Sequence, residues 1–185
     1  MSLSKILARP AILGLLAALA ASPSLAALPQ GAKAPDFSLT ASLAGKPFAF
    51  SLLNARRQGP VVLYFFPAAF TQGCTLEAHM FAEATDSFKA MGATVVGVTA
   101  GGVDRVAEFS KLECRNKFAV AADPGAKIAS EYETVMKLPN VTLSERTSFV
   151  IAPDGTILLS YTNMNPQEHI SRAMAAVRAW KASHG

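Results

Sequence analysis

Cys74 is the side chain of this sequence whose setting is best suited to chemistry. It follows a polar turn at residues 71–73, which comes after a short apolar run at 61–66 closed by Pro67. This change of pattern places Cys74 at or near the first turn of a helix, where free backbone N–H groups and the positive end of the helix dipole favour a thiolate. We therefore predict a reactive thiol. The alternative is a small buried apolar residue, as free cysteines often are, but the polar turn argues against it.

Two apolar strands and the helix between them must position Cys74. Residues 61–66 form a continuous β-branched and aromatic run, which predicts a strand buried on both faces. After the turn, apolar residues recur every four positions and predict an amphipathic helix that ends at Gly92. These residues are Leu76, Met80, Ala84 and Phe88, with Phe81 beside them. Residues 94–99 read as a second apolar strand, so we expect a βαβ unit with parallel strands and a right-handed crossover.

The remaining segments extend this unit into one α/β domain. We predict a helix from Asp104, as its cap, to about Cys114, and a loop without clear periodicity at 133–145. Further strands are predicted at 36–40, 48–51, 118–122, 147–151 and 156–161, and further helices at 52–57, 127–132 and after Asn165. An N-terminal hairpin and flanking helices around a mixed central sheet make a three-layer sandwich, the arrangement of the thioredoxin fold.

The first residues have the features of a secretory signal peptide. Lys5 and Arg9 precede a short apolar run at 11–21, and small residues at 24–26 offer a cleavage site before Ala27. We therefore expect a signal peptide at 1–26, a mature domain at 27–185 and a periplasmic location. The alternative is an uncleaved anchor in the inner membrane that faces the periplasm, although the run is short for a span. An oxidising compartment gives weight to the two cysteines of the chain.

Charge and composition argue against several other classes of protein. The net charge of +4 includes Lys5 and Arg9 of the leader, so the mature part carries only two more basic than acidic residues. The basic residues are scattered without interleaved aromatic residues, and we expect no nucleic-acid partner. The three histidines and two cysteines lack the spacing of a metal site, and no cofactor is predicted.

The pattern Pro67-x-x-x-Thr71-x-x-Cys74 resembles the active-site signature of the peroxiredoxins. The opening at 34–37 and the segment 146–155 also resemble that family, as does the last helix, so the resemblance covers essentially all of the mature chain. Within the alkyl hydroperoxide reductase/thiol-specific antioxidant group, the sequence is most similar to the Q-type branch, which is like the bacterioferritin comigratory protein.

The resemblance implies a thiol-dependent peroxidase that reduces hydrogen peroxide, alkyl hydroperoxides or both. Cys74 would attack the peroxide and become a sulfenic acid. Arg146 would lower the pKa of the thiol and stabilise the charge that develops along the O–O bond. Thr71 would hold the thiolate or a peroxide oxygen, although it could also merely cap the helix. Pro67 would shape the loop and screen the pocket from solvent.

A sulfenic acid must then be reduced, often by a resolving thiol. Many Q-type relatives place that thiol five residues after the nucleophile, where this sequence has His79. Cys114 remains, in a polar stretch at 113–117 that predicts an exposed side chain. Our hypothesis is a Cys74–Cys114 disulfide that requires local unwinding of the helix. The alternative is a one-cysteine enzyme reduced by an external thiol. The expected reductant is a thioredoxin-like protein or a small thiol, and the expected assembly is a monomer or homodimer.

The same fold is also compatible with two other functions. A thiol–disulfide oxidoreductase would use Cys-x-x-Cys, but Cys74 is followed by Thr-Leu-Glu. A copper-carrying or purely binding module would need a second nearby thiol and a positioned histidine, and the sequence supplies neither convincingly.

Overall fold

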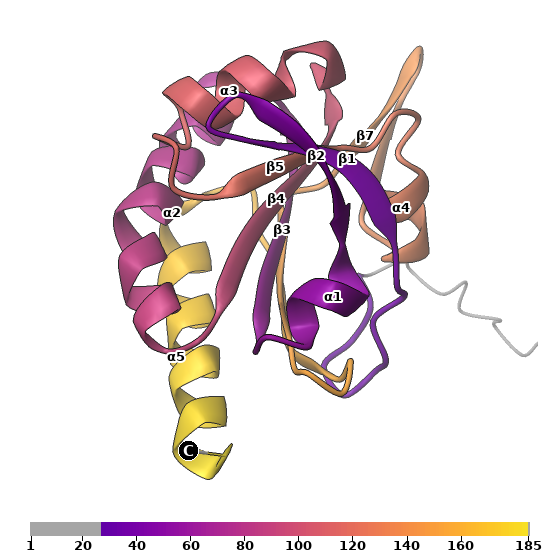
Figure 1. Cartoon of the computed structure of the whole chain (residues 1–185). Helices are drawn as coiled ribbons and strands as arrows, with labels where there is room; N and C mark the ends of the chain where they lie inside the picture. Colours follow the sequence, from indigo (N-terminus) through magenta and orange to yellow (C-terminus); the bar gives the residue numbers. More distant parts are fainter. Residues whose placement is uncertain (1–26, 185) are drawn as a thin grey trace, which may run out of the picture.

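A mixed sheet of seven strands forms the centre of the computed structural model, which describes residues 27–184 (Figure 1). Across the sheet lie β2 (Lys46–Ser51), β1 (Ser38–Leu43), β5 (Ala119–Ala122), β4 (Thr94–Gly101), β3 (Val61–Ala68), β8 (Thr147–Ile151) and β9 (Ile157–Thr162). The strands β5, β4 and β3 are parallel, and every other pair of neighbours is antiparallel. The predicted parallel centre with antiparallel hairpins is confirmed.

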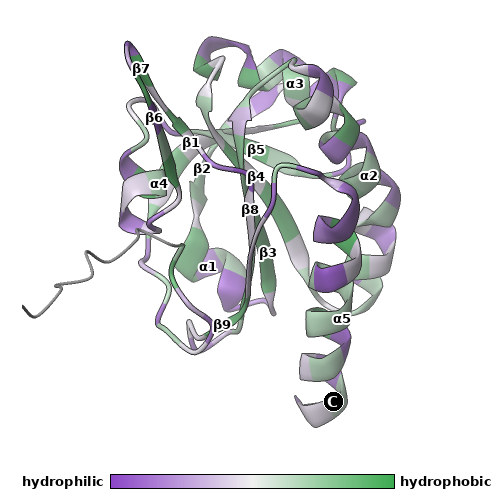
Figure 2. Cartoon of the chain, turned by 180° about the vertical axis from the view of Figure 1, so that it is seen from behind, coloured by the Kyte–Doolittle hydropathy of each residue, from purple (hydrophilic) through white to green (hydrophobic). Residues whose placement is uncertain are grey.

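Helices cover both faces of this sheet and complete three layers. On one face lie α2 (Gln72–Ala90), α3 (Val106–Leu112) and α5 (Gln167–His184), and on the other lie α1 (Leu52–Arg56) and α4 (Lys127–Glu131). Strand β3 supplies both cores, because Val62, Tyr64 and Phe66 face the first group while Val61, Leu63 and Phe65 face the second. Figure 2 shows the hydrophobic residues concentrated along the central strands. The prediction of a doubly buried strand is confirmed.

The segment at 133–145 was predicted to be a loop, and this was wrong. It forms a small separate hairpin of β6 (Val135–Leu138) and β7 (Val141–Ser144). Each strand has four residues, too few for a period to be recognised in the sequence. The hairpin packs over the ends of β3 and β4, and the Ser144 hydroxyl donates a hydrogen bond to the Phe66 carbonyl at 3.2 Å.

The start of the helix that precedes Cys114 also differs from the prediction. Residues Val103–Arg105 form a 3₁₀ turn before α3, and the residue that caps α3 is Arg105 rather than Asp104. Within residues 27–184, no helix combines the length and the apolar character needed to cross a membrane. The predicted signal peptide at 1–26 lies outside the described residues.

The buried face of α2 is rotated from the predicted one. Leu76 is 48% exposed, and the buried side chains of the helix are Cys74, Glu77, Ala78, Phe81, Ala82, Thr85 and Phe88. The prediction followed apolar residues alone and therefore left the polar Glu77 and Thr85 outside the core. Thr85 satisfies its hydroxyl within the helix, on the Phe81 carbonyl at 2.7 Å.

Because the buried face of α2 is rotated, truncating two apolar residues of this helix should change the free energy of unfolding by very different amounts. Phe81→Ala removes a fully buried ring and should cost about 3–5 kcal/mol in the free energy of unfolding. Leu76→Ala, the matched control, should change it by less than about 0.5 kcal/mol, because the side chain is half exposed. Urea denaturation of both variants measures the difference. Equal losses would contradict this assignment of the face.

Candidate active site

Cys74 lies at the third position of α2, as the pattern of the sequence predicts. The helix begins directly after the loop that follows β3, and its first backbone bond runs from the Thr75 N–H to the Thr71 carbonyl at 2.9 Å. The N–H groups before Thr75 therefore have no partner within the helix. No acidic residue lies in this first turn. The thiol is free and only 1% exposed, so its sulfur lies at the positive end of a helix in a nearly water-free setting.

Arg146 brings a fixed cation to this sulfur. Its Nη2 donates a hydrogen bond to the Cys74 Sγ at 3.4 Å, and its Nε donates to the Met164 carbonyl at 3.0 Å. The third side of the guanidinium, at Nη1, is paired with the Glu77 carboxylate. Burial alone would lower the pKa of Arg146, but the neighbouring Glu77 and Cys74 outweigh it and raise the pKa above its usual value. The arginine therefore stays charged beside the thiol.

Glu77 is a residue of this site that the sequence reasoning missed. It is fully buried and lies three residues after Cys74, hence on the same face of α2. Burial raises the pKa of its carboxyl to about 8, against the opposing effect of Arg146. Its second oxygen, Oε1, has no hydrogen-bond partner among the described residues. The i+3 spacing from the cysteine is the signal that could have identified it.

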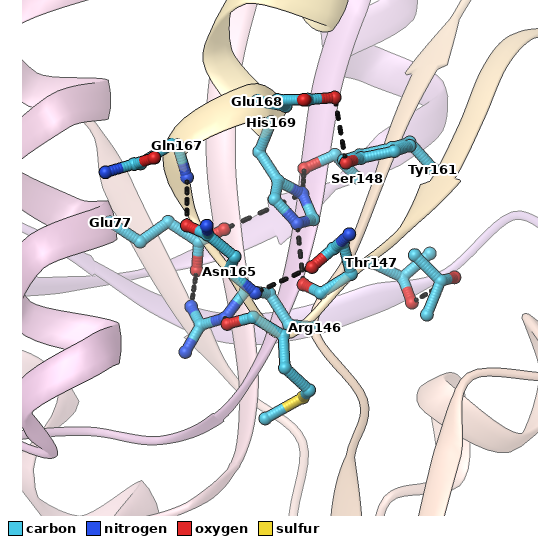
Figure 3. A network of polar contacts seen from close by, with 12 residues as sticks. Glu77, Arg146, Thr147, Ser148, Tyr161, Asn165, Gln167, Glu168 and His169 are labelled. Carbon is cyan, nitrogen blue, oxygen red and sulfur yellow. Dashed lines mark hydrogen bonds and ion pairs between the residues drawn. The ribbon is translucent and has the colours of Figure 1, made fainter.

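Behind Glu77 lies a second buried titratable group, His169 in the first turn of α5 (Figure 3). Its Nδ1 is 2.8 Å from the Ser148 hydroxyl and 3.8 Å from the Glu77 Oε1, and its Nε2 is 2.9 Å from the Asn163 carbonyl. Burial lowers the pKa of His169 to about 4, so the imidazole is neutral at pH 7. The sequence analysis also missed this residue, although it shares the buried face of α5 with Ala173 and Val177.

Thr71 and Pro67 occupy the loop and the strand that lead to the cysteine. The Thr71 hydroxyl donates to the Ala68 carbonyl at 3.2 Å, so it neither caps α2 nor contacts the sulfur in this structure. Pro67 is buried within β3, which continues one residue beyond it instead of ending at Phe66 as predicted. Its carbonyl accepts a hydrogen bond from Thr99 at 3.3 Å, which ties the loop to β4. Among residues 27–184, no cluster of side chains is arranged for a metal ion.

Comparison with known proteins identifies the family. The family model described as "AhpC/TSA family" matches residues 30–160. The chain belongs to this family. It is 31% identical over 153 residues to the chloroplastic peroxiredoxin Q of Sedum lineare, with 82% of this chain and 79% of that protein covered. A putative peroxiredoxin of Mycobacterium tuberculosis is 31% identical over 137 residues, covering 73% of this chain and 87% of that protein.

Solved structures agree with this assignment. Peroxidoxin BcpB from Mycobacterium tuberculosis superposes with a TM-score of 0.74 at 29% identity, covering 81% of this chain and 96% of that one. Xylella fastidiosa PrxQ, at 22% identity and a TM-score of 0.72, shares the fold over 84% of this chain and 98% of its own. The protein is therefore a peroxiredoxin of the Q-type branch and a thiol-dependent peroxidase. The two rival functions weighed from the sequence are not favoured.

The second cysteine of this peroxiredoxin is not exposed as predicted. Cys114 lies two residues beyond α3, is fully buried and belongs to the same hydrophobic cluster as Cys74. Burial raises the pKa of its thiol well above the usual value, and Glu113 adds to the effect. Both thiols are free. The polar residues around Cys114 misled the prediction, because they turn toward α2 and leave the cysteine facing the core.

One hydrogen bond and two ion pairs join these polar neighbours to the helix of the peroxiredoxin that carries Cys74. They are His79–Glu113 at 2.7 Å, Glu83–Arg115 at 3.1 Å and Asp86–Lys117 at 2.7 Å. The position that holds a resolving thiol in many relatives is thus occupied by a histidine bonded to the neighbour of Cys114. The active-site helix and the segment 113–117 are held together by these pairs.

The buried carboxyl of Glu77 predicts how the stability of this peroxiredoxin depends on pH. The native state keeps the Glu77 proton up to about pH 8, whereas an ordinary glutamic acid releases it near 4.5, so stability is lost as the pH rises through this interval. His169, with a pKa lowered from 6.5 to about 4, acts in the opposite direction only below 6.5. Between pH 6.5 and 8, the free energy of unfolding of wild type should therefore fall, relative to that of Glu77→Gln, by up to about 1.4 kcal/mol per pH unit.

Urea denaturation at several pH values between 6.5 and 8 measures this slope. Glu77→Gln should remove it, because the amide does not titrate. Glu83→Gln, which alters an exposed carboxyl on the same helix, should leave it unchanged. The same slope in wild type and Glu77→Gln would contradict the assignment of the buried proton.

Proposed function

We propose that Cys74 is the peroxidatic nucleophile of this enzyme and that Arg146 is the cation that activates it. The observation that carries the proposal is the hydrogen bond of 3.4 Å from the Arg146 Nη2 to the Cys74 Sγ in a buried site. A cation at that distance favours the thiolate over the thiol, and low local polarity strengthens the effect. The unpaired N–H groups of the first turn of α2 act in the same direction.

The reaction transfers one oxygen atom and two electrons. The thiolate sulfur of Cys74 attacks one oxygen of the hydroperoxide, an S–O bond forms and the O–O bond breaks. The electron pair of that bond leaves on the other oxygen as hydroxide or alkoxide, which takes up a proton to give water or an alcohol. Arg146 is held by Met164 and Glu77, so it can stabilise this charge without moving. Cys74 remains as a sulfenic acid.

The flanking residues support this step in different ways. Thr71 is exposed and lies directly before the first residue of α2. Rotation of its hydroxyl away from the Ala68 carbonyl would let it donate to a peroxide oxygen. Pro67 shapes the loop through its carbonyl bond to β4. Met164, whose carbonyl accepts a hydrogen bond from Arg146, is 59% exposed and adds apolar surface beside the site. This surface suits alkyl hydroperoxides as well as hydrogen peroxide, and a structure of similar fold from Xanthomonas campestris is described by its alkyl peroxide reduction activity.

Peroxide consumption with excess dithiothreitol tests the two central roles. Cys74→Ser should abolish it, and Arg146→Gln should reduce the second-order rate constant by about 10²–10³-fold, the usual loss when a donor to a developing oxyanion is removed. Arg178→Gln, the control, changes an exposed arginine of α5 and should keep the wild-type rate. Retained activity in a folded Cys74→Ser would overturn the assignment.

The proposal extends to Cys114 as the resolving thiol. Its sulfur attacks the sulfenic sulfur of Cys74, an S–S bond forms, and the hydroxide that leaves takes up a proton as water. A thioredoxin-like dithiol or a small thiol then reduces the disulfide. Both cysteines are buried, so the reaction needs the first turn of α2 and the segment 113–117 to open. The contacts of the segment 113–117 with His79, Glu83 and Asp86, farther along α2, oppose the opening of that segment.

Peptide mapping after peroxide treatment tests the role of Cys114. Wild type should yield an intramolecular Cys74–Cys114 disulfide, and Cys114→Ser should accumulate sulfenic acid and lose turnover with a thioredoxin-like donor. Glu113→Gln, which weakens the hydrogen bond with His79, should form the disulfide faster than wild type. Glu131→Gln, which changes an exposed side chain at the end of α4, is the control. Unchanged turnover of Cys114→Ser would favour the one-cysteine alternative with an external thiol.

We further propose that the enzyme works in the periplasm after cleavage between Ala26 and Ala27. The support is the basic, apolar and small-residue order of the first 26 residues. Retention as an inner-membrane anchor is the alternative, and the proposed assembly is a monomer or homodimer. The N-terminal sequence of the protein from a periplasmic extract distinguishes cleavage from anchoring.

A further inference from the structure

We propose that His169 is a positioning residue of the peroxidase site, which accepts a hydrogen bond from the protonated carboxyl of Glu77 and so keeps the charge of Arg146 available to Cys74. The inference rests on the proposed roles of Cys74 and Arg146. It is drawn from a chain of buried contacts from Cys74 to Arg146, from Arg146 to Glu77 and from Glu77 to His169. Figure 3 shows the last two of these contacts.

The hydrogen bonds of His169 determine its tautomer. Its Nε2 lies 2.9 Å from the Asn163 carbonyl, which can only accept, so Nε2 carries the hydrogen. Because burial keeps the ring neutral, Nδ1 has a free lone pair and is an acceptor. The Ser148 hydroxyl, at 2.8 Å, donates to it in the structure. The next polar atom is the Glu77 Oε1 at 3.8 Å.

The contacts of Glu77 decide where a proton on its carboxyl must lie. The Oε2 atom faces the Nη1 donor of Arg146, so a carboxyl proton belongs on Oε1. That oxygen has no hydrogen-bond partner among the described residues, and the imidazole Nδ1 is the acceptor that faces it. Closing the gap to hydrogen-bond length takes a shift of about 1 Å. Ser148 and a protonated Glu77 therefore compete for one lone pair.

Burial keeps this proton on the Glu77 carboxyl, although the charge of Arg146 opposes it. Glu77 faces Arg146, His169, the Tyr64 phenol and the Cys74 thiol. His169 is additionally influenced by Arg172 and Glu168 on its own helix, which form a surface ion pair with each other at 2.6 Å. The two arginines both disfavour an imidazolium, while burial disfavours a carboxylate. At pH 7 the Glu77 carboxyl therefore carries the proton and is neutral, and the His169 ring is neutral as well.

The protonation state of Glu77 controls the charge that Cys74 experiences. A neutral carboxyl leaves the guanidinium with its full positive charge beside the sulfur. An ionised carboxylate at the same place offsets most of that charge, and the effect is large where water is excluded. Ionisation of Glu77 should therefore weaken stabilisation of the thiolate and of the leaving oxygen, so that the rate of peroxide reduction falls at alkaline pH.

The pH profile of the second-order rate constant for hydrogen peroxide tests the inference. In wild type the rate should fall with a midpoint near the Glu77 pKa of about 8. Glu77→Gln, which mimics the neutral carboxyl, should lose this fall. His169→Phe removes the acceptor and should move the midpoint down by about one pH unit, as loss of a hydrogen bond to the neutral form requires. His169→Asn, which keeps an acceptor near Nδ1, should restore it in part.

A variant that should shift the midpoint of the pH profile in the opposite direction keeps the test independent of folding defects at His169. Ser148→Ala removes the competing hydroxyl, leaves Nδ1 free for Glu77 and should move the midpoint up. His184→Asn, on the exposed end of the same helix, should leave the profile unchanged. The same midpoint in wild type, His169→Phe and Ser148→Ala would overturn the inference, as would an alkaline fall that persists in Glu77→Gln. An active Cys74→Ser would instead refute the proposed function itself.

Discussion

The pairing of one buried arginine with both a thiol and a carboxyl is the constraint on which this site depends. Arg146 contacts Cys74, Glu77 and the Met164 backbone from three sides of one planar group. A buried charge is costly unless it is paired and fully hydrogen-bonded, so these three contacts must form together when the chain folds. They join α2, the start of β8 and the segment before α5, which are far apart in the sequence.

The sheet makes this convergence possible. Strand β3 lies between β4 and β8, so the loop that leads to Cys74 and the residue that precedes β8 meet at the same end of the sheet. The aromatic side chains of β3 pack on both faces and hold the strand in register, with Tyr64 stacked on Phe81 of α2 at 4.3 Å between ring centroids. The position of the thiol is thereby fixed by the core, and the charge around it by Arg146 and its contact with Glu77.

Local patterns in the sequence were sufficient for the strand, the turn and the helix around Cys74, because each depends on neighbouring residues. Contacts across the fold were not accessible in this way. Arg146 was singled out through the family resemblance, and Glu77 was left outside the core because a charged residue is rarely buried without a partner that only the fold supplies. Cys114 was predicted to be exposed from its polar neighbours, whose side chains in fact pair with α2.

The most direct measurement of the central claim is the chemical state of each cysteine after a single turnover. The Cys114→Ser variant, treated with one equivalent of hydrogen peroxide and a reagent that traps sulfenic acid, can be analysed by peptide mass spectrometry. The account predicts that the reagent labels Cys74 as its sulfenic acid, and that the yield of label falls greatly when Arg146→Gln is added. A Cys74 that stays a free thiol while peroxide is consumed would contradict it.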